Sequence, residues 1–381
     1  MSSPEALLVG LRGFGFAKSR LPLIQALRER GWRVAVFANR DAHAEAIEKI
    51  GGTEFVDAGF GAGSIAPATD FRAVRALRRR IRTNPPALVH FFNAKPMLLG
   101  LLALRGLGFK GVAVCTVTGL GHAFVQNAFV RGAATGLYRV LLRSASAVVF
   151  QNPDDLEFFV DRGLVDRARA RLIVSSGVDT ALFRPAATGM GTSRPVTVLM
   201  ATRLLRSKGV MDYLDAGRRL KAARPEVRLL LAGEVATGHP DAIVESTLKS
   251  RAAEAAVEFL GYRSDLHQLL REVDLLVHPS YYNEGVPRVL LEAAASGVAA
   301  ITTDLPGCRE AVEAGVTGVL VPPRDPERLH AAMSTLTSDA GRLASMGRAA
   351  RRLAEDRFDM RRITDAQLAL YDELLSGAPG R

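Results

Sequence analysis

Short apolar runs that alternate with amphipathic segments constrain the fold of this 381-residue chain more than any other feature. In the N-terminal half, apolar runs of strand length recur at 6–9, 34–38, 88–92, 112–117 and 147–150. Segments of helical periodicity separate these runs. Strands that alternate with helices form a parallel sheet covered by helices on both faces. The pattern therefore predicts an α/β fold.

The alternation stops at 175–194, where Gly, Pro, Ser and Thr gather without periodicity, and then starts again. The second series of apolar runs covers 196–200, 227–232, 257–260, 275–278, 299–302 and 319–321. We expect two doubly wound, Rossmann-like domains, 1–183 and 184–357, that face each other across a cleft. Substrates would bind at the carboxyl ends of the strands. A final amphipathic helix is predicted over 349–375.

The net charge of +11 is concentrated in the N-terminal half. Residues 1–180 carry 24 Lys and Arg against 14 Asp and Glu, which is +10, and residues 181–381 carry 26 against 25, which is +1. Such an excess favours an acidic partner: nucleic acid, anionic lipid or a phosphorylated substrate. Nucleic acid fits least well, because no recognised binding module accompanies the charge and only 6% of the residues are aromatic.

A predicted helix over 71–82 carries much of this charge on one side. The arginines on its basic face are Arg72, Arg75, Arg79 and Arg82. The opposite face is apolar and consists of Val74, Leu77 and Ile81. Peripheral membrane proteins present such basic amphipathic helices to anionic lipid. The alternative is an ordinary solvated helix face above a core.

Neither secretion nor a membrane span is expected. The N-terminus lacks the basic start and long apolar run of a secretory signal, and no stretch reaches the roughly 18 apolar residues of a spanning helix. Cys115 and Cys308 show neither metal-ligand spacing nor a disulfide framework, which suits a reducing compartment. We expect a cytoplasmic protein that is peripheral on the inner face of the cytoplasmic membrane.

The most informative segment is 279–297, PSYYNEGVPRVLLEAAASG, which follows the apolar run 275–278. A helix is predicted to begin near Pro287, because proline is pre-set for the first helical position, and a helix N-terminus attracts anions. Glu284 precedes this start, and Glu292 lies inside the helix. Eight helical residues span roughly 12 Å, about the reach for one carboxylate to meet a sugar and the other a ribose across a diphosphate.

Two cations are placed to offset these carboxylates. Arg203 and Lys208 lie in the loop after the run 196–200, near the carboxyl end of the first strand of the second domain. A guanidinium binds phosphate oxygens bidentately, an ammonium supplies compact charge, and both would stabilise a departing nucleoside diphosphate. Each residue taken alone is more simply a solvated side chain. Their joint position at strand-to-helix junctions favours a nucleotide-sugar site.

A glycine-rich segment, GLRGFGFA at 10–17, follows the first apolar run. A turn containing Gly13 and Gly15 would bring backbone N–H groups to the donor phosphate. With Asp41 after the next run, the segment also looks like a dinucleotide fingerprint. Lys18 occupies the third glycine position, which disfavours a dehydrogenase.

The C-terminal half resembles the retaining family 4 glycosyltransferases of the GT-B fold, the glycosyl transferases group 1. The resemblance lies in the Glu284-x7-Glu292 spacing of EGVPRVLLEAAASG, in DLPGCRE at 304–310, in GVTGVLVPP at 315–323 and in FLGYRSD at 259–265. It implies a closing helix, 358–375, that returns to the N-terminal domain.

The same resemblance implies a role for each donor-side residue. Glu292 would bind the ribose hydroxyls. Glu284 and the backbone of Gly285, Val286 and Pro287 would hold the donor sugar. Arg203 and Lys208 would bind the diphosphate, and the turn that contains Tyr262 and Arg263 would border the base.

Two N-terminal motifs resemble a subgroup of this family that extends polyprenyl-diphosphate-linked sugars, often from UDP-activated N-acetylhexosamines. They are HFFNAKP at 90–96 and TVTGLGHAF at 116–124. Lys95 lies in the first motif and is assigned to the acceptor side. His122 lies in the second and would guide the acceptor proton. The alternative for His122 is a structural or solvent-facing histidine.

These features predict transfer of a UDP-activated hexose or N-acetylhexosamine from a nucleotide-sugar donor to a hydroxyl of a lipid-linked sugar acceptor. Retention at the anomeric carbon follows from the resemblance alone. Because no obvious nucleophile is present, we expect a front-face route in which the leaving phosphate helps to deprotonate the acceptor. No Asp-x-Asp motif is present, so neither a metal nor another cofactor is expected. A nucleotide-sugar epimerase and a non-catalytic nucleotide-sugar- or lipid-binding module are the alternatives.

Overall fold

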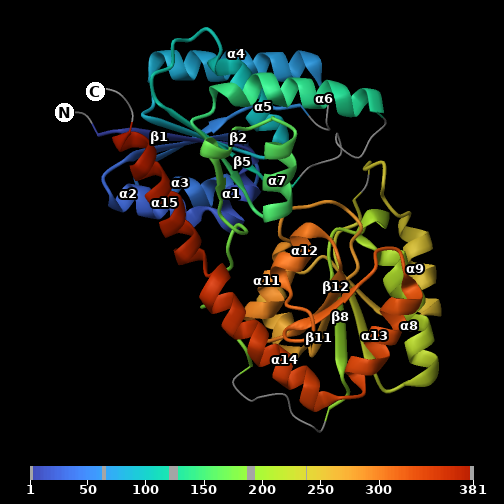
Figure 1. Cartoon of the computed structure of the whole chain (residues 1–381). Helices are drawn as coiled ribbons and strands as arrows, with labels where there is room; N and C mark the ends of the chain where they lie inside the picture. The colour runs from blue at the N-terminus through green and yellow to red at the C-terminus, as the bar shows by residue number, and fades with distance from the viewer. Residues whose placement is uncertain (1–2, 62–65, 120–127, 187–193, 237, 378–381) are drawn as a thin grey trace. The chain divides into compact units, whose positions relative to one another are not determined.

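The computed structural model describes residues 3–61, 66–119, 128–186, 194–236 and 238–377 (Figure 1). The chain forms two compact units. The first unit comprises Met1–Ser176 and Met360–Arg381, and the second comprises Gly177–Asp359. Each unit is built on its own parallel sheet, which confirms the predicted α/β fold with two Rossmann-like domains.

The first unit contains a seven-stranded parallel sheet in the order β3-β2-β1-β4-β5-β6-β7. Its strands are β1 (Glu5–Arg12), β2 (Arg33–Asn39), β3 (Thr53–Asp57), β4 (Leu88–Phe92), β5 (Val112–Val117), β6 (Ala147–Phe150) and β7 (Ala170–Leu172). The direction of winding reverses between β1 and β4. Ligands of doubly wound sheets bind beyond the carboxyl ends of the strands at such a switch point.

Helices cover both faces of this sheet, because side chains alternate along each strand between two cores. On β4, Val89 and Phe91 belong to one core and Leu88 and Phe92 to the other. The first core is closed by α4 (Pro67–Thr83), α5 (Ala94–Leu104), α6 (Ala128–Leu141) and α7 (Pro153–Asp161). The second is closed by α1 (Gly13–Ser19), α2 (Leu21–Glu29), α3 (Ala44–Glu48) and α15 (Met360–Ser376).

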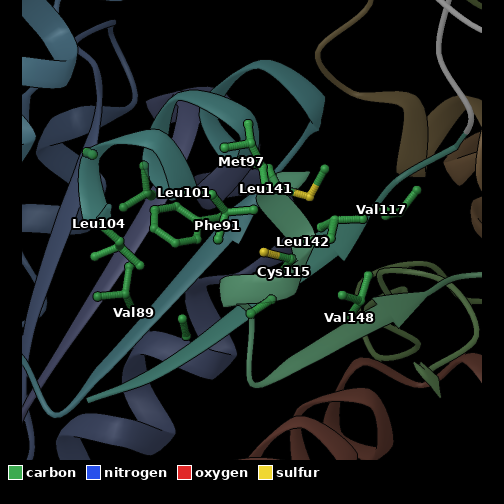
Figure 2. Packing of buried hydrophobic residues seen from close by; sticks show 14 of the residues in the cluster. Val89, Phe91, Met97, Leu101, Leu104, Cys115, Val117, Leu141, Leu142 and Val148 are labelled. Carbon is green, nitrogen blue, oxygen red and sulfur yellow. The ribbon is translucent and has the colours of Figure 1, made fainter. Parts of the chain in front are cut away.

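Figure 2 shows the first core, in which Phe91 of β4 lies beside Leu101 of α5. Gly100 makes room for this ring, since a Cβ there would be 2.1 Å from it. Cys115 is fully buried in the same core, and burial raises the pKa of its thiol far above the usual range. Cys115 therefore acts as a small packed hydrophobe.

The second unit contains a six-stranded parallel sheet in the order β10-β9-β8-β11-β12-β13, which reverses between β8 and β11. Its strands are β8 (Thr197–Ala201), β9 (Arg228–Ala232), β10 (Glu258–Gly261), β11 (Leu275–His278), β12 (Ala299–Thr303) and β13 (Gly318–Val321). One face is covered by α8 (Val210–Ala223), α9 (Glu245–Glu254) and α13 (Pro326–Thr337). The remaining helices are α10 (Leu266–Leu269), α11 (Arg288–Ala295), α12 (Pro306–Ala311) and α14 (Ala340–Leu353).

Two local predictions were wrong, and the start of a third element lies close to where it was expected. The turn expected after residue 9 does not form, because β1 stays paired with β2 as far as Arg12 and α1 begins at Gly13. The helix predicted near Pro287 is α11, which begins one residue later at Arg288, because the ψ of 121° at Pro287 is extended. The helix expected over 349–375 is divided: a π-helical turn, Ala354–Phe358, follows α14, and an extended Asp359 separates it from α15.

Hydrogen bonds explain where the second unit begins and ends. The Val178 N–H donates to the carbonyl of Phe358 at 2.8 Å. Arg351 donates to the carbonyls of Thr180 and Phe183, at 3.0 and 2.8 Å. These bonds attach the start of the unit to its last helix, so the unit spans Gly177–Asp359, whereas 184–357 was expected. In the described part of the chain, no helix has the length and apolar character needed to span a bilayer.

Candidate functional site

Two of the predicted donor residues meet at the switch point of the second sheet. Because β8 and β11 are neighbours, the loops that follow them emerge at the same edge. Lys208 ends a short 3-10 turn after β8, and Glu284 follows β11. The two loops touch through backbone: the Tyr281 N–H donates to the Ser207 carbonyl at 2.9 Å. Gly209 has a φ of 74°, and a Cβ there would be 2.1 Å from the Pro279 carbonyl oxygen, so this approach requires glycine.

Lys208 and Glu284 form a close ion pair at this point. The ammonium nitrogen of Lys208 lies 2.6 Å from both Oε1 and Oε2 of Glu284. The Lys208 side chain is only 8% exposed, and that of Glu284 is 22% exposed. A pair this buried is weakly screened, so each partner depends on the other to offset the cost of its own burial.

Two further side chains, which sequence reasoning did not single out, complete the environment of Glu284. His278 Nε2 lies 3.2 Å from Oε1, and the Ser280 hydroxyl donates to the same oxygen at 3.1 Å. Among the described residues, Oε1 thus meets three donors and Oε2 meets only Lys208. Oε2 is the oxygen with capacity left for a ligand hydroxyl. His278 is the last residue of β11, and in the sequence it continues an apolar run that predicts a core position. Its contact with Glu284 is seen only in the structure.

The pKa of Glu284 reflects these contacts. Burial alone would raise it, but the Lys208 ammonium and the hydrogen bonds from His278 and Lys208 outweigh burial and lower the pKa to about 2. Glu284 is therefore an anion throughout the physiological pH range. It accepts hydrogen bonds and does not serve as a proton donor.

Arg203 is placed differently from Lys208. It also follows β8, but its side chain is exposed, and within the described ranges it makes no hydrogen bond or ion pair. Its charge is close enough to Tyr282 to oppose the rise that burial and Glu284 cause in the pKa of that phenol. Lys208 is already matched by a carboxylate, whereas Arg203 has charge available to an incoming anion.

Glu292 lies on α11, the helix that follows Glu284. Its Oε1 is 3.1 Å from Nη2 of Arg288, one turn earlier on the same helix. The other terminal nitrogen of Arg288, Nη1, is buried and has no hydrogen-bond partner in the described part of the chain. Arg288 was not among the predicted site residues, although its i to i+4 spacing from Glu292 is visible in the sequence.

The segment between Glu284 and Glu292 packs against the start of α12. Gly285, Val286 and Pro287 are buried. Gly307 at the start of α12 lies against them, and a Cβ there would be only 1.8 Å from the Gly285 carbonyl oxygen and 2.6 Å from that of Glu284. Gly307 was not among the predicted site residues, yet it fixes where this backbone runs.

Comparisons with known proteins divide the chain near the boundary between the two units. Residues 14–175 match the Glycosyl transferase 4-like domain, and residues 192–353 match Glycosyl transferases group 1. The chain thus carries a glycosyl transferase 4-like domain followed by a glycosyl transferases group 1 domain. This confirms the family to which the sequence motifs point.

Two relatives illustrate the match. N,N'-diacetylbacillosaminyl-diphospho-undecaprenol alpha-1,3-N-acetylgalactosaminyltransferase of Campylobacter jejuni is 26% identical over 372 residues, which covers 93% of this chain and 95% of the relative. Glycogen synthase of Mycobacterium tuberculosis is 33% identical over 201 residues, which covers 52% of this chain and 47% of that enzyme. The first similarity extends through both units.

Solved structures show the same fold. A glycosyltransferase from Rickettsia africae superposes with a TM-score of 0.78 at 18% identity, over 98% of this chain and 99% of its own. Alr3699/HepE of Anabaena, solved in complex with UDP, has a TM-score of 0.77 at 22% identity, over 97% and 100%. Each chain thus shares the fold of this protein, with two parallel-sheet domains.

Tyr262 and Arg263 follow β10, which β9 separates from β8. Tyr262 is 61% exposed, and Arg263 makes a bidentate ion pair with Asp265, at 2.7 and 2.6 Å. The sheet therefore places both residues two strands away from the Lys208–Glu284 pair. The exposed Tyr262 ring could contact a base only if the nucleotide extends along this edge.

In the first unit of the glycosyltransferase, Gly13 and Gly15 fall in α1. The Phe14 N–H, one of the groups expected to reach a donor phosphate, donates instead to Oδ2 of Asp41 at 2.9 Å. Gly13 allows this contact, since a Cβ there would be 2.7 Å from Oδ1 of Asp41. A carboxylate thus caps the start of α1, while Gly15 faces open space.

The acceptor-side residues are divided by the structure. Arg72, Arg75, Arg79 and Arg82 are exposed along α4, as the helical wheel predicts. Lys95 is not exposed in this way: it pairs with Asp70 at 2.8 Å and donates to the Gly61 carbonyl at 2.9 Å. This pair joins α4 to α5, and it gives Lys95 a structural role. His122 lies outside the described residues.

Proposed function

We propose that this glycosyltransferase moves a sugar from a UDP-activated donor to a hydroxyl of a polyprenyl-diphosphate-linked sugar, with retention at the anomeric carbon. The observation that carries the proposal is the Lys208–Glu284 ion pair at the switch point of the second sheet. The Campylobacter jejuni relative, whose name gives a diphospho-undecaprenol-linked substrate, supports the acceptor class. HepE, solved with UDP, supports the base.

On the donor side, the carboxylates bind the hydroxyls of the nucleotide sugar and the exposed arginine binds its diphosphate. Oε2 of Glu284 accepts a hydrogen bond from a donor-sugar hydroxyl, while Lys208 keeps the carboxylate ionised and oriented. Arg203 meets the diphosphate, since its side chain is exposed and its charge is not matched by a carboxylate in the described structure. Glu292, oriented by Arg288, accepts hydrogen bonds from the ribose hydroxyls.

In the transfer step, the bond between the anomeric carbon and the phosphate oxygen breaks, and a bond from the acceptor oxygen forms on the same face. The acceptor hydroxyl gives its proton to the leaving phosphate, so the products are the lengthened glycan and the nucleoside diphosphate. Negative charge grows on the phosphate as it departs. Arg203 stabilises this charge, an interaction that strengthens in the transition state. No metal is needed for these steps.

On the acceptor side, the basic face of α4 brings the enzyme to the membrane that holds the lipid carrier. Its four exposed arginines act together with Phe71, which is 62% exposed and whose ring centroid lies 6.0 Å from the Arg75 guanidinium carbon. Arginine attracts anionic headgroups, and an exposed aromatic ring partitions into the interfacial region. We propose peripheral association with the inner face of the cytoplasmic membrane.

The test begins with a thermal-shift screen over UDP, GDP and ADP sugars, because a ligand of the native state raises Tm. The stabilising donor is then incubated with polyprenyl-diphosphate-linked N-acetylglucosamine in detergent micelles, with and without EDTA. The anomeric configuration of the product is read from the coupling of its anomeric proton by NMR. The proposal requires an unchanged anomeric configuration and full activity in EDTA.

Three results would contradict the proposal. An inverted product overturns retention, and loss of activity in EDTA overturns metal independence. An isomerised sugar in the reaction that contains donor alone identifies an epimerase. The matched control is Glu245→Gln on α9, which removes a carboxylate from the exposed Glu245–Lys249 pair and leaves transfer unchanged.

A further inference from the structure

A pocket opens at the switch point of the first sheet, and among the described residues that line it Gly15 is the one predicted site residue. It is lined by Gly10, Leu11, Arg12, Phe14, Gly15, Phe16, Arg20, Phe92 and Asn93. These residues come from the ends of β1 and β4 and from the start of α1 and α2, where the order of the sheet reverses. A pocket at this place is where a doubly wound sheet binds its ligand.

Asn93, the residue that follows β4, has a disfavoured backbone. Its φ of 69° and ψ of 150° fall in a region that is populated almost only by glycine. The chain nevertheless has asparagine here, and its side chain is exposed at the pocket. Nδ2 donates to the Thr118 hydroxyl at 3.3 Å, which fixes the direction of the amide. Glycine at this position would relieve the strain. The presence of asparagine therefore indicates that the side-chain amide has a function at the pocket.

Phe92, the residue before Asn93, is packed against Arg20 and His90, and these contacts fix the backbone that leads into Asn93. The guanidinium of Arg20 lies 4.0 Å above the Phe92 ring, and the His90 ring lies against Phe92 with centroids 3.9 Å apart. His90 is buried between Thr116, at 2.7 Å from Nε2, and the hydroxyl of Tyr371 on α15, which hydrogen-bonds Nδ1. Burial and the charge of Arg20 lower the pKa of His90, so the histidine is neutral.

The walls of the pocket indicate the kind of ligand. Leu11 and Phe14 are 37% and 46% exposed and offer apolar surface, which suits the C–H face of a sugar ring. An amide both donates and accepts hydrogen bonds, which suits vicinal hydroxyls. Arg12 is exposed, and its side chain has no hydrogen bond or ion pair within the described ranges, so it can meet a phosphate attached to that sugar.

We propose that this pocket binds the sugar 1-phosphate portion of the acceptor, with Asn93 on the sugar hydroxyls and Arg12 on the phosphate. The inference rests on the proposed function, since it names where the acceptor of that reaction sits. A donor phosphate in the same pocket fits less well, because the Asp41 carboxylate already caps α1 beside it. The strain at Asn93 is then the cost of aiming an amide at the acceptor.

The test compares three variants with the wild-type enzyme. Asn93→Gly removes the amide and the strain, and Asn93→Ala removes the amide and keeps the strain. Ala256→Gly is the matched control, because Ala256 is another non-glycine residue of positive φ, at 50°, in the second unit. We expect both Asn93 variants to raise the acceptor KM at least tenfold, with unchanged donor KM and unchanged hydrolysis of donor alone. Asn93→Gly should also raise Tm, as Ala256→Gly should, and Asn93→Ala should not.

A second readout does not depend on turnover. Saturation-transfer NMR with N-acetylglucosamine 1-phosphate as the probe should give a signal with the wild-type enzyme and a much weaker one with Asn93→Ala. Arg12→Gln should weaken the signal of this probe but not that of N-acetylglucosamine. A wild-type enzyme that binds the probe but transfers no sugar would overturn the proposed function and leave this site standing. Equal signals from wild type and Asn93→Ala, or an effect on donor KM instead of acceptor KM, would overturn the site.

Discussion

The ammonium of Lys208 lies 2.6 Å from both carboxylate oxygens of Glu284, although 76 positions separate the two residues in the chain. Each residue stands in the loop after a different strand, and the two strands are neighbours at the switch point of the second sheet. The pair keeps Glu284 ionised and leaves the buried ammonium matched. In the proposed reaction, this lets two residues of opposite charge both serve a diphosphate sugar.

Replacing Glu284 by glutamine should reduce both activity and stability. The neutral amide leaves the Lys208 charge buried without its counter-ion, which costs about 3 kcal/mol. The loss of a preorganised polar contact to the sugar should lower kcat/KM by about 100-fold or more. Urea unfolding and initial transfer rates measure the two effects. In the double variant Glu284→Gln with Lys208→Met, stability should recover while activity stays low; additive losses of stability would contradict the pairing.

The ion pair also predicts how stability depends on pH. The folded pKa of Glu284 is lowered from 4.5 to about 2, so the pair contributes fully above pH 4.5 and its contribution disappears as pH falls toward 2. The Tm difference between wild type and Lys208→Met should therefore be constant near neutrality and shrink across this window. Lys249→Met breaks the exposed pair with Glu245 and should give a small difference at every pH. A Lys208→Met difference that grows with acid would reverse the assigned sign.

Gly307→Ala should displace the backbone of Glu284 and Gly285, against which Gly307 packs. The added Cβ would lie 1.8 Å from the Gly285 carbonyl oxygen, so one of the two backbones must move. We expect a loss of about 1–3 kcal/mol of stability and a larger relative loss of transfer activity, since Glu284 is adjacent. Gly341→Ala on α14 is the control, because its nearest neighbour would be at an ordinary 3.5 Å. Chemical denaturation and steady-state kinetics report both, and unchanged activity in Gly307→Ala would argue against a fixed loop.

The basic face of α4 should bind anionic membranes. Replacing Arg72, Arg75 and Arg79 by glutamine removes three charges worth about 1 kcal/mol each at a lipid surface, so vesicle affinity should fall by about 100-fold. Cosedimentation with phosphatidylglycerol vesicles measures this, and phosphatidylcholine vesicles show the dependence on anionic lipid. The charge-matched control is Arg342, Arg348 and Arg352→Gln on α14, all exposed. Equal affinity in the two triple variants would place the membrane surface elsewhere.

The alternation of apolar runs predicted most of the fold. The bounds of β4, β5, β6 and β11 are those of the runs, because these central strands are buried along their whole length. Two strands of the described structure, β3 and β7, were not predicted from the sequence. Both lie at edges of the sheet and have exposed or half-buried positions, so their sequences lack a continuous apolar run.

The predicted site residues fared unevenly for a related reason. Lys208, Glu284 and Glu292 stand in motifs whose local spacing is visible, and the structure places the first two in contact. Lys95 stands in a motif as well, yet its charge pairs with Asp70. That pair joins α4 to α5, so a local sequence pattern could not predict it.

By itself the sequence determined the class of fold, the two parallel sheets and the family, because these depend on local periodicity and on short motifs. Only the tertiary structure decided that β8 lies beside β11, that Lys208 and Glu284 form a pair, that Asp41 caps α1, and that Asn93 is held at a positive φ beside a pocket. Strand order and side-chain partners arise from packing between distant segments. The free energy that selects them depends on contacts between segments far apart in the chain, so it cannot be read from any short stretch of sequence.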